Sequence, residues 1–99
     1  MSHRGSILCL PSGIHGWNAV TTADFNSASF ERILAEAAEI EILLVGTGRD
    51  LARLPPVLHQ KLRDLRISAD PMSTGAAVRT YNVLLAEKRR VAAALLAVD

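Results

Sequence analysis

The residues that most constrain this fold form a short, mainly apolar run that stops at Gly46-Thr47-Gly48: Ile40, Ile42, Leu43, Leu44 and Val45. A run of this kind, rich in β-branched residues, is typical of a strand whose two faces are both covered by other elements. A turn containing two glycines is a common end for such a strand. The run therefore predicts a buried strand within an α/β domain.

Three further segments have the spacing of amphipathic helices, because their apolar residues recur every three or four positions. They are Phe30, Ile33, Leu34, Ala37 and Ala38 in the first segment, Leu54, Leu58, Leu62 and Leu65 in the second, and Ala77, Tyr81, Leu84 and Leu85 in the third. We expect Ser27 or Ser29 to cap the first helix and Ser73 or Thr74 to cap the third. Pro55-Pro56 opens the second.

The remaining apolar stretches predict strands at 6–10, 14–19, 67–70 and 91–98. Pro71 cannot donate to a strand ladder, which places it at a strand end or on an edge strand. The last stretch contains three consecutive alanines that would also suit a helix, but its continuous apolar character favours a central strand. The predicted order is β-β-α-β-α-β-α-β, with about five strands and three helices. An opening hairpin followed by parallel crossovers makes the sheet mixed.

Length and charge limit the class of protein. A chain of 99 residues is expected to form a single domain, 1–99. Eleven basic against ten acidic residues give a formal charge of +1, which supplies no global field for nucleic acid or an anionic membrane. Apolar runs fall far short of the roughly 20 residues of a membrane helix. The first residues lack the pattern of a signal or transit peptide, so we expect a cytoplasmic protein.

Several kinds of site are not expected. Cys9 is the single cysteine and lies within an apolar strand, which favours an inert buried thiol. The three histidines have no metal-ligand spacing, so no metal is expected. Gly46-x-Gly48 lacks the rest of a dinucleotide or P-loop fingerprint, so no cofactor is expected. Lys88-Arg89-Arg90 lacks an accompanying nucleic-acid motif, and a solvated face is favoured there over nucleic-acid binding.

Nearly the whole chain resembles the small α/β domain family that includes the mitochondrial complex I assembly factor 3 and an adipogenesis-associated protein. The matching residues are 6–11, Trp17, 43–48 and, most specifically, 72–85. The resemblance implies a three-layer fold around a mixed sheet and no established catalytic activity. Relatives carry a further N-terminal segment ending in a strand, so we expect one sheet edge here to be uncovered and open to self-association or a partner strand. Pro71 also departs from the family pattern, so the strand before it is expected to end early.

Two polar turns are the candidate binding site: Gly46, Thr47, Gly48 and Arg49, and Ser73, Thr74 and Gly75. Ligands of open α/β sheets bind outside the carboxyl ends of strands. Free N–H groups at the start of the third helix, with Arg49 and Arg79, would hold a small anion such as a carboxylate or phosphate. The structural alternative is that the glycines make tight turns, Thr74 caps, and the arginines are solvated or pair with Asp50 and Asp70.

Tyr81 and Asn82 are possible supporting residues, since a phenol beside an arginine can donate a proton. The favoured interpretation is that the Tyr81 ring packs in the core with its hydroxyl bonded to backbone, while Asn82 lies on the surface. Trp17 is the candidate partner surface because aromatic residues are enriched at binding hot spots. These observations favour a non-enzymatic interaction or assembly-factor-like module, with a binder or weak enzyme for a small anionic ligand as the alternative.

Overall fold

The computed structural model describes residues 5–19, 21–26, 28–49 and 51–97. Within them, five strands and three α-helices follow one another in the predicted order, with two short 3-10 turns at Thr22–Asp24 and Ala37–Glu39. The elements are β1 (Ser6–Leu10), β2 (Gly13–Trp17), α1 (Glu31–Ala35), β3 (Ile42–Gly46), α2 (Pro56–Asp64), β4 (Ser68–Met72), α3 (Thr74–Ala86) and β5 (Val91–Leu95). The expected α/β class and element order are confirmed.

The strands form one mixed sheet in the order β2-β1-β5-β3-β4. β1 is antiparallel to both β2 and β5, whereas β3 is parallel to β5 and β4. The prediction that the last apolar stretch forms a central strand is confirmed for Val91–Leu95, which occupies the centre of the sheet. Its three alanines are fully buried, as a central strand covered on both faces requires. Val98, the predicted end of this strand, lies outside the described residues.

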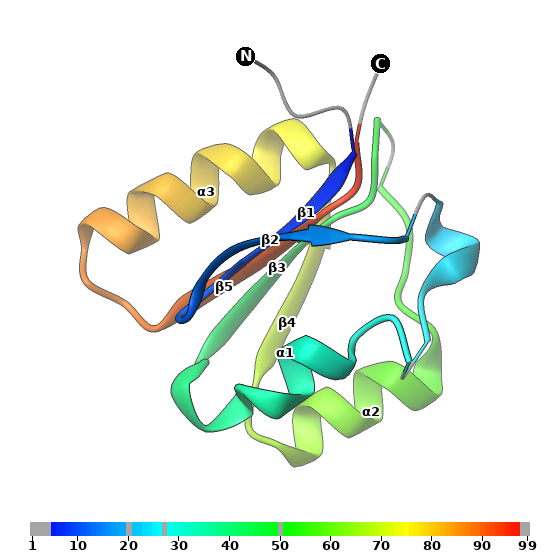
Figure 1. Cartoon of the computed structure of the whole chain (residues 1–99), viewed down its shortest axis with the longest axis horizontal. Coiled ribbons are helices and arrows are strands. Elements are labelled where there is room, and N and C mark those ends of the chain that lie inside the picture. Colours follow the sequence, from blue (N-terminus) through cyan, green and yellow to red (C-terminus); the bar gives the residue numbers. More distant parts are fainter. Residues whose placement is uncertain (1–4, 20, 27, 50, 98–99) are drawn as a thin grey trace.

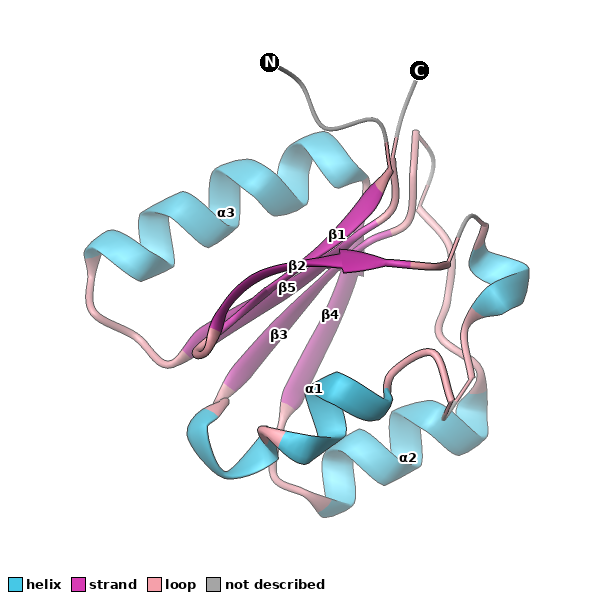
Figure 2. Ribbon diagram, in the orientation of Figure 1, coloured by secondary structure: helices cyan, strands magenta, loops and turns pink. Residues whose placement is uncertain are grey.

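Helices cover the two faces of the sheet unequally. Figure 1 and Figure 2 show α1 and α2 on one face and α3 alone on the other, which confirms three layers. The larger core lies on the side of α1 and α2 and contains three aromatic rings, those of Trp17, Phe25 and Phe30. The smaller core lies under α3, which packs on β3 and β5. Since α3 packs mainly on the middle of the sheet, β1 and β2 are less covered on that face.

The first helix is shorter than its periodicity predicts. α1 ends at Ala35, a 3-10 turn follows, and Ala38 is exposed. Ser29 does not cap it, because Phe30 occupies the cap position without a side-chain hydrogen bond. Ser27, the other predicted cap, lies outside the described residues. Ser29 instead pairs with Asn26, donating its N–H to Oδ1 at 2.8 Å. Five residues are too few for helical propensity to hold the segment, so burial of Phe30 and Ile33 positions it.

Two predicted core leucines are exposed. Leu65 follows the last residue of α2 and is 42% exposed, because the chain leaves the helix there and turns at Arg66 with φ of 64°. Leu85 lies on the flank of α3, beyond the strip that meets the sheet, and is 50% exposed. The starts of α2 and α3 were predicted correctly: Pro56 lies in the first turn of α2, and Ser73 caps α3 by accepting from the Ala76 N–H.

Pro71 does not end its strand, so the expectation of an early end was wrong. β4 continues to Met72, with Pro71 aligned with Val45 of β3. The Ser68 N–H donates to the Glu41 carbonyl and the Thr47 N–H donates to the Met72 carbonyl, so the even-numbered residues of β4 face β3. Pro71 therefore faces outward from an edge strand, where its missing N–H removes no ladder bond. The alternative expectation, an edge position, is confirmed.

Candidate functional site

The two predicted turns lie side by side at one end of the sheet. The Gly48 N–H donates to Thr74 Oγ1 at 2.9 Å, and the Thr74 N–H donates to the Gly48 carbonyl at 2.8 Å. Thr74 Oγ1 in turn donates to the Leu96 carbonyl at 2.9 Å. One buried hydroxyl thus joins the turn after β3, the start of α3 and the end of β5.

Gly46 is required by how closely α3 approaches the end of β3. A Cβ on Gly46 would lie 2.9 Å from both Cα and Oγ1 of Thr74 and 3.1 Å from a methyl carbon of Leu95. The first of these atoms is backbone, so it cannot move aside without moving α3. Gly48 has φ of 94°, a conformation that favours glycine. The two glycines therefore serve packing and turn geometry.

Thr47 and Ser73 also have structural partners. The Thr47 N–H and hydroxyl both donate to the Met72 carbonyl, at 2.8 and 3.1 Å, and the Thr47 oxygen accepts from the Ala52 N–H at 3.2 Å. Ser73 Oγ accepts from the Ala76 N–H at 3.4 Å. The expectation of free N–H donors at the start of α3 is therefore partly wrong, because the N–H groups of Thr74 and Ala76 already donate within the protein.

The nearest cavity is mostly apolar. It has a volume of about 260 Å³ and lies between the start of α3 and the β1 and β5 strands. Of the eight predicted pocket residues, Thr74 alone lines it; the other lining residues are Gly5, Ile7, Val78, Leu95, Leu96 and Ala97. Ala97 is held beside it by an N–H bond to Ser6 Oγ at 3.1 Å. This depression suits an apolar group better than an anion.

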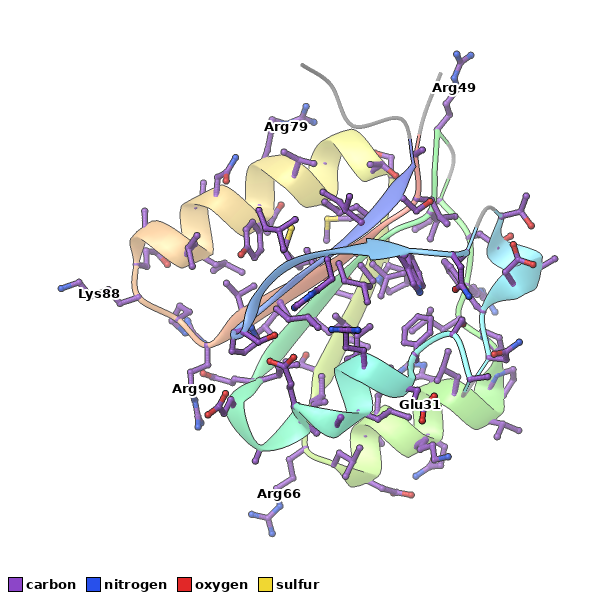
Figure 3. All side chains as sticks on the ribbon, viewed as in Figure 1. Glu31, Arg49, Arg66, Arg79, Lys88 and Arg90 are labelled. Carbon is purple, nitrogen blue, oxygen red and sulfur yellow. The ribbon has the colours of Figure 1, made fainter. Side chains whose placement is uncertain are left out.

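The two predicted arginines lie at the same end of the molecule as the turns. Figure 3 shows Arg49 on the loop after β3 and Arg79 on α3, both extending away from the body of the protein. Both side chains are exposed. A Cβ on Gly75 would come within 3.8 Å of Arg79 Nη1, so this guanidinium lies back over the first turn of α3. Asp50, a predicted partner, lies outside the described residues.

The Tyr81 ring and the Asn82 side chain lie as the favoured interpretation predicts. Tyr81 is half-buried and packs against the smaller core, while Asn82 is exposed. Burial raises the pKa of the Cys9 thiol above its ordinary value of 9.0. Burial, and secondarily the negative charge that Cys9 would carry as a thiolate, raise the pKa of Tyr81 above 10.0. Both groups therefore hold their protons at neutral pH, and Cys9 is the expected buried, protonated thiol.

Trp17 is a core residue, so its assignment to a partner surface was wrong. It is 7% exposed, and its Nε1–H donates to the Ser29 carbonyl at 2.7 Å. Its ring stacks on Phe25 with centroids 5.6 Å apart and meets Phe30 edge-to-face at 5.5 Å. The alternation of β2 directs Trp17 into the larger core, where α1 covers it.

A polar network that sequence reasoning missed joins the β1–β2 turn to α1. The Ser12 hydroxyl donates to Glu36 Oε2 at 2.6 Å, and the Ser12 N–H donates to Oε1 at 3.0 Å. His15 lies between Ser12 Oγ, 2.8 Å from Nε2, and Arg32 Nη1, 3.2 Å from Nδ1. Because arginine can only donate, Nδ1 accepts, which leaves the His15 proton on Nε2 and directs it to Ser12. The four-residue spacing of Arg32 and Glu36 was a weak signal of this network. The sequence does not show that α1 lies beside the β1–β2 turn.

Two further findings concern metals and membranes. Among the described residues, no group of three or more His, Cys, Asp and Glu side chains lies close enough together to hold a metal ion. Across the same ranges, no helix has the length and apolar character needed to cross a bilayer.

The labelled basic side chains at the other end of the sheet, Arg66, Lys88 and Arg90, point in different directions from Arg49 and Arg79 (Figure 3).

The fold and the interlocked turns define a small three-layer α/β domain with a mixed five-stranded sheet. The chain belongs to the family described as protein of unknown function (DUF498/DUF598), whose model matches residues 1–96. This finding agrees with the resemblance expected from residues 72–85. The family description assigns no activity.

Relatives fall into two groups. An uncharacterized protein of Rhodobacter capsulatus is 45% identical over 94 residues, which is 95% of this chain and 70% of that protein. The NADH dehydrogenase (ubiquinone) 1 alpha subcomplex assembly factor 3 of Xenopus tropicalis is 34% identical over 92 residues, and the human protein of that name is 33% identical. The chain spans about half the length of these assembly factors, 50% in both cases.

Solved structures have the same fold. A Bartonella henselae protein named as an outer membrane protein is 56% identical, with a TM-score of 0.94 over 100% of this chain and 83% of its own. An NMR structure of a Rhodopseudomonas palustris protein is 41% identical, with a TM-score of 0.91 over 100% of this chain and 73% of its own. A Bordetella pertussis protein described as a Mth938-like domain is 34% identical, with a TM-score of 0.76 over 93% of this chain and 73% of its own.

Proposed function

We propose that the chain is a non-enzymatic protein-binding module that assists the assembly of another protein complex. The observation that carries the proposal is its similarity to assembly factor 3, which extends over 93% of the chain. A match of that extent includes most of the domain. The similarity therefore extends over most of the domain and is not confined to a single motif, which supports a shared mode of action.

The local chemistry is consistent with this proposal. Thr47, Ser73 and Thr74 make structural hydrogen bonds, and the Cys9 thiol is buried and protonated. Exposed apolar side chains are instead spread over the surface elements. Ile14 on β2, Val57 on α2 and Val83 on α3 are 73%, 77% and 58% exposed. Exposed apolar side chains of this size are available for contact with another protein.

Affinity purification at natural expression level, in the organism that encodes the chain, tests the proposal. We expect a stoichiometric protein partner to be retained at moderate salt. Arg79→Glu and Lys88→Glu change exposed charges within α3 and just beyond its end, so comparing them locates the binding surface. Recovery of the chain alone in repeated purifications, with and without cross-linking, contradicts an interaction module. Loss of NADH:ubiquinone activity on gene deletion would support the more specific assembly role.

A weak site for a small anion is the second proposed function. Its support is the position of Arg49 and Arg79 at the end of the sheet where the two turns meet, with the Arg79 guanidinium over Gly75. A guanidinium group can hold a carboxylate or phosphate through charge-assisted hydrogen bonds. Since Thr74 and Ala76 N–H groups donate internally, the arginines supply the binding energy.

Amide NMR titration with inorganic phosphate tests this second function. Saturable shifts are expected at Gly48, Arg49, Gly75 and Arg79, and the Arg79→Ala variant loses them. Arg63→Ala, an exposed arginine on α2, is the matched control and leaves the shifts unchanged. Shifts spread evenly over all exposed basic residues would reject the site, because they would indicate nonspecific screening.

We also propose that the chain acts in the cytoplasm. The absence of a membrane-crossing helix among the described residues is compatible with this location. The Bartonella henselae relative, however, is named as an outer membrane protein. Fractionation of cells that carry the natural gene distinguishes the two. Recovery in the membrane pellet after a high-salt wash contradicts a cytoplasmic location.

A further inference from the structure

A cavity whose described lining residues all lie outside the candidate site is found beside β4, at the edge of the sheet. It has a volume of about 440 Å³, within the range typical of small-molecule sites, about 300–1,000 Å³. The described residues that line it are Arg53, Leu54, Pro56, His59 and Pro71. They come from the loop before α2, from the first turns of α2 and from β4, which packs against that helix.

The walls of this cavity are apolar and are held in place by the fold. Leu54 belongs to the larger core and is 6% exposed. Pro56 is the first residue of α2. Pro71 lies on the same face of β4 as Ala69, which packs against the larger core, so its ring is on the α2 side of the sheet. Because a proline ring has no side-chain rotamers to lose, a ligand that packs against these rings orders little of the protein.

The polar part of the lining is cationic. Arg53 carries a permanent positive charge, and the His59 ring has an N–H donor. Both side chains are exposed, and within the described part of the chain neither has a hydrogen bond or an ion pair. No acidic residue is among the described lining residues. Two donors beside apolar walls are therefore available to an anion.

These features select the chemistry of the ligand. A guanidinium forms charge-assisted hydrogen bonds with a carboxylate, often two in parallel. The permanent charge of Arg53 matches a monoanion, whereas a dianion would leave one charge uncompensated against apolar walls. Proline rings pack well on aromatic rings, as they do where proline-rich segments dock in aromatic grooves. A cavity of about 440 Å³ has room for one or two such rings.

We propose that this cavity binds an aromatic monocarboxylate of one or two rings. The rings pack against Pro56 and Pro71, and the carboxylate accepts hydrogen bonds from Arg53 and His59. The site goes beyond the functions proposed above, because it uses neither a protein partner nor the residues of the two turns. No covalent bond forms or breaks on binding, so the site is compatible with a non-enzymatic module.

NMR titration of the whole 99-residue chain with benzoate and with 2-naphthoate tests this inference. Saturable shifts are expected at the amides of Arg53 and Leu54 and at the His59 ring. 2-Naphthoate binds about threefold or more tighter than benzoate, because its second ring buries more apolar area. Benzamide keeps the ring but lacks the charge, so it binds about tenfold or more weaker than benzoate.

Variants with matched controls separate the two parts of the site. Arg53→Gln weakens benzoate binding about tenfold or more, whereas Arg63→Gln, which changes an exposed arginine of α2 outside the described lining, leaves it unchanged. Pro56→Ala removes one wall and weakens 2-naphthoate binding about threefold, whereas Val57→Ala in the same turn has no effect. Circular dichroism confirms that each variant is folded.

The absence of saturable shifts below about 10 mM ligand overturns the inference. Equal affinities for benzoate and benzamide overturn it as well, as does an Arg53→Gln variant that binds benzoate like the parent. Shifts of the same size at Arg63 and Lys88 have the same consequence, because they indicate nonspecific adsorption. The functions proposed above stand or fall separately, since co-purification and the phosphate titration at Arg79 do not depend on this cavity.

Discussion

Gly48 and Thr74 exchange two hydrogen bonds across 26 residues of sequence, at 2.9 Å from the Gly48 N–H and 2.8 Å from the Thr74 N–H. The exchange fixes the loop after β3 against the start of α3. The same threonine also holds the end of β5 through the Leu96 carbonyl. Thr74 therefore links the loop after β3 and the start of α3 to the end of β5. Its hydroxyl is expected to contribute strongly to stability.

Replacing Thr74 by valine keeps the shape and removes the hydroxyl. The Gly48 N–H and the Leu96 carbonyl then lose their partner, which costs about 2–4 kcal/mol because buried polar groups left unpaired are costly. Urea unfolding, with an unchanged slope, measures the loss. Thr74→Ser retains the hydroxyl and is expected to stay within about 1 kcal/mol of the parent. Equal stability of the valine and serine variants would show that the hydroxyl bonds contribute little.

Gly46→Ala tests the close approach of α3 to β3. The added Cβ meets the Thr74 backbone at 2.9 Å, so we expect a loss of about 1–3 kcal/mol through displacement of the helix. Gly75→Ala is the matched control. Its Cβ makes an ordinary 3.8 Å contact with Arg79, and alanine favours a helix, so stability is unchanged or slightly higher. Thermal unfolding of the two variants side by side measures the contrast; a Gly46→Ala variant as stable as the parent contradicts the packing argument.

Trp17→Ala distinguishes a core tryptophan from a surface one. Removing the ring takes away contacts with Phe25 and Phe30 and leaves a cavity, at a cost of about 3–5 kcal/mol. Ile14→Ala, on the same strand but 73% exposed, is expected to change monomer stability by less than about 0.5 kcal/mol. Denaturant unfolding at low protein concentration provides both values. A Trp17→Ala variant of near-parent stability would contradict the assignment of Trp17 to the core.

Alkaline pH is expected to destabilise the fold through Cys9 and Tyr81. Burial raises the pKa of Cys9 above 9.0 and that of Tyr81 above 10.0, so the folded protein holds these protons more tightly than the unfolded chain. This contribution is complete below about pH 9 and is lost as the pH rises through the raised values. One such group gives a slope of at most about 1.4 kcal/mol per pH unit.

Cys9→Ala and Tyr81→Phe each remove one of these protons. Unfolding free energies measured between pH 7 and pH 11 are expected to fall less steeply in both variants than in the parent. The comparison uses slopes, so any constant loss of packing in Cys9→Ala does not affect it. Identical slopes in all three proteins would contradict proton retention by the buried pair.

The sheet was predictable because its central strands carry continuous apolar runs. β3 and β5 have both faces covered, and their sequences show it directly. α1 was not predictable in length, since Ala37 and Ala38 continue a helical spacing that the 3-10 turn interrupts. Trp17 was misassigned because hot-spot enrichment says nothing about which face of β2 is buried. Pro71 was misjudged because sequence alone does not reveal which strand residues face outward.

For the candidate site, the meeting of the two turns follows from general rules, since strands parallel to one another end at the same edge of a sheet. The hydrogen bonds of Thr74 did not follow, because they depend on β5 ending beside α3. Likewise the contact of Ser12 with Glu36, 24 residues away, depends on where α1 crosses under the hairpin. Local sequence fixes turns and caps, whereas such contacts depend on the packed arrangement.

Pro71 has a consequence for what this molecule avoids. A chain of copies adding head to tail would have to lay the β2 of each against the β4 of the next, and every junction would lack one backbone donor. Filament growth through the sheet is thereby penalised at each step, in concentrated solution as much as in the crowded cell. A single imino acid on the outer strand thus acts as a safeguard against fibre formation.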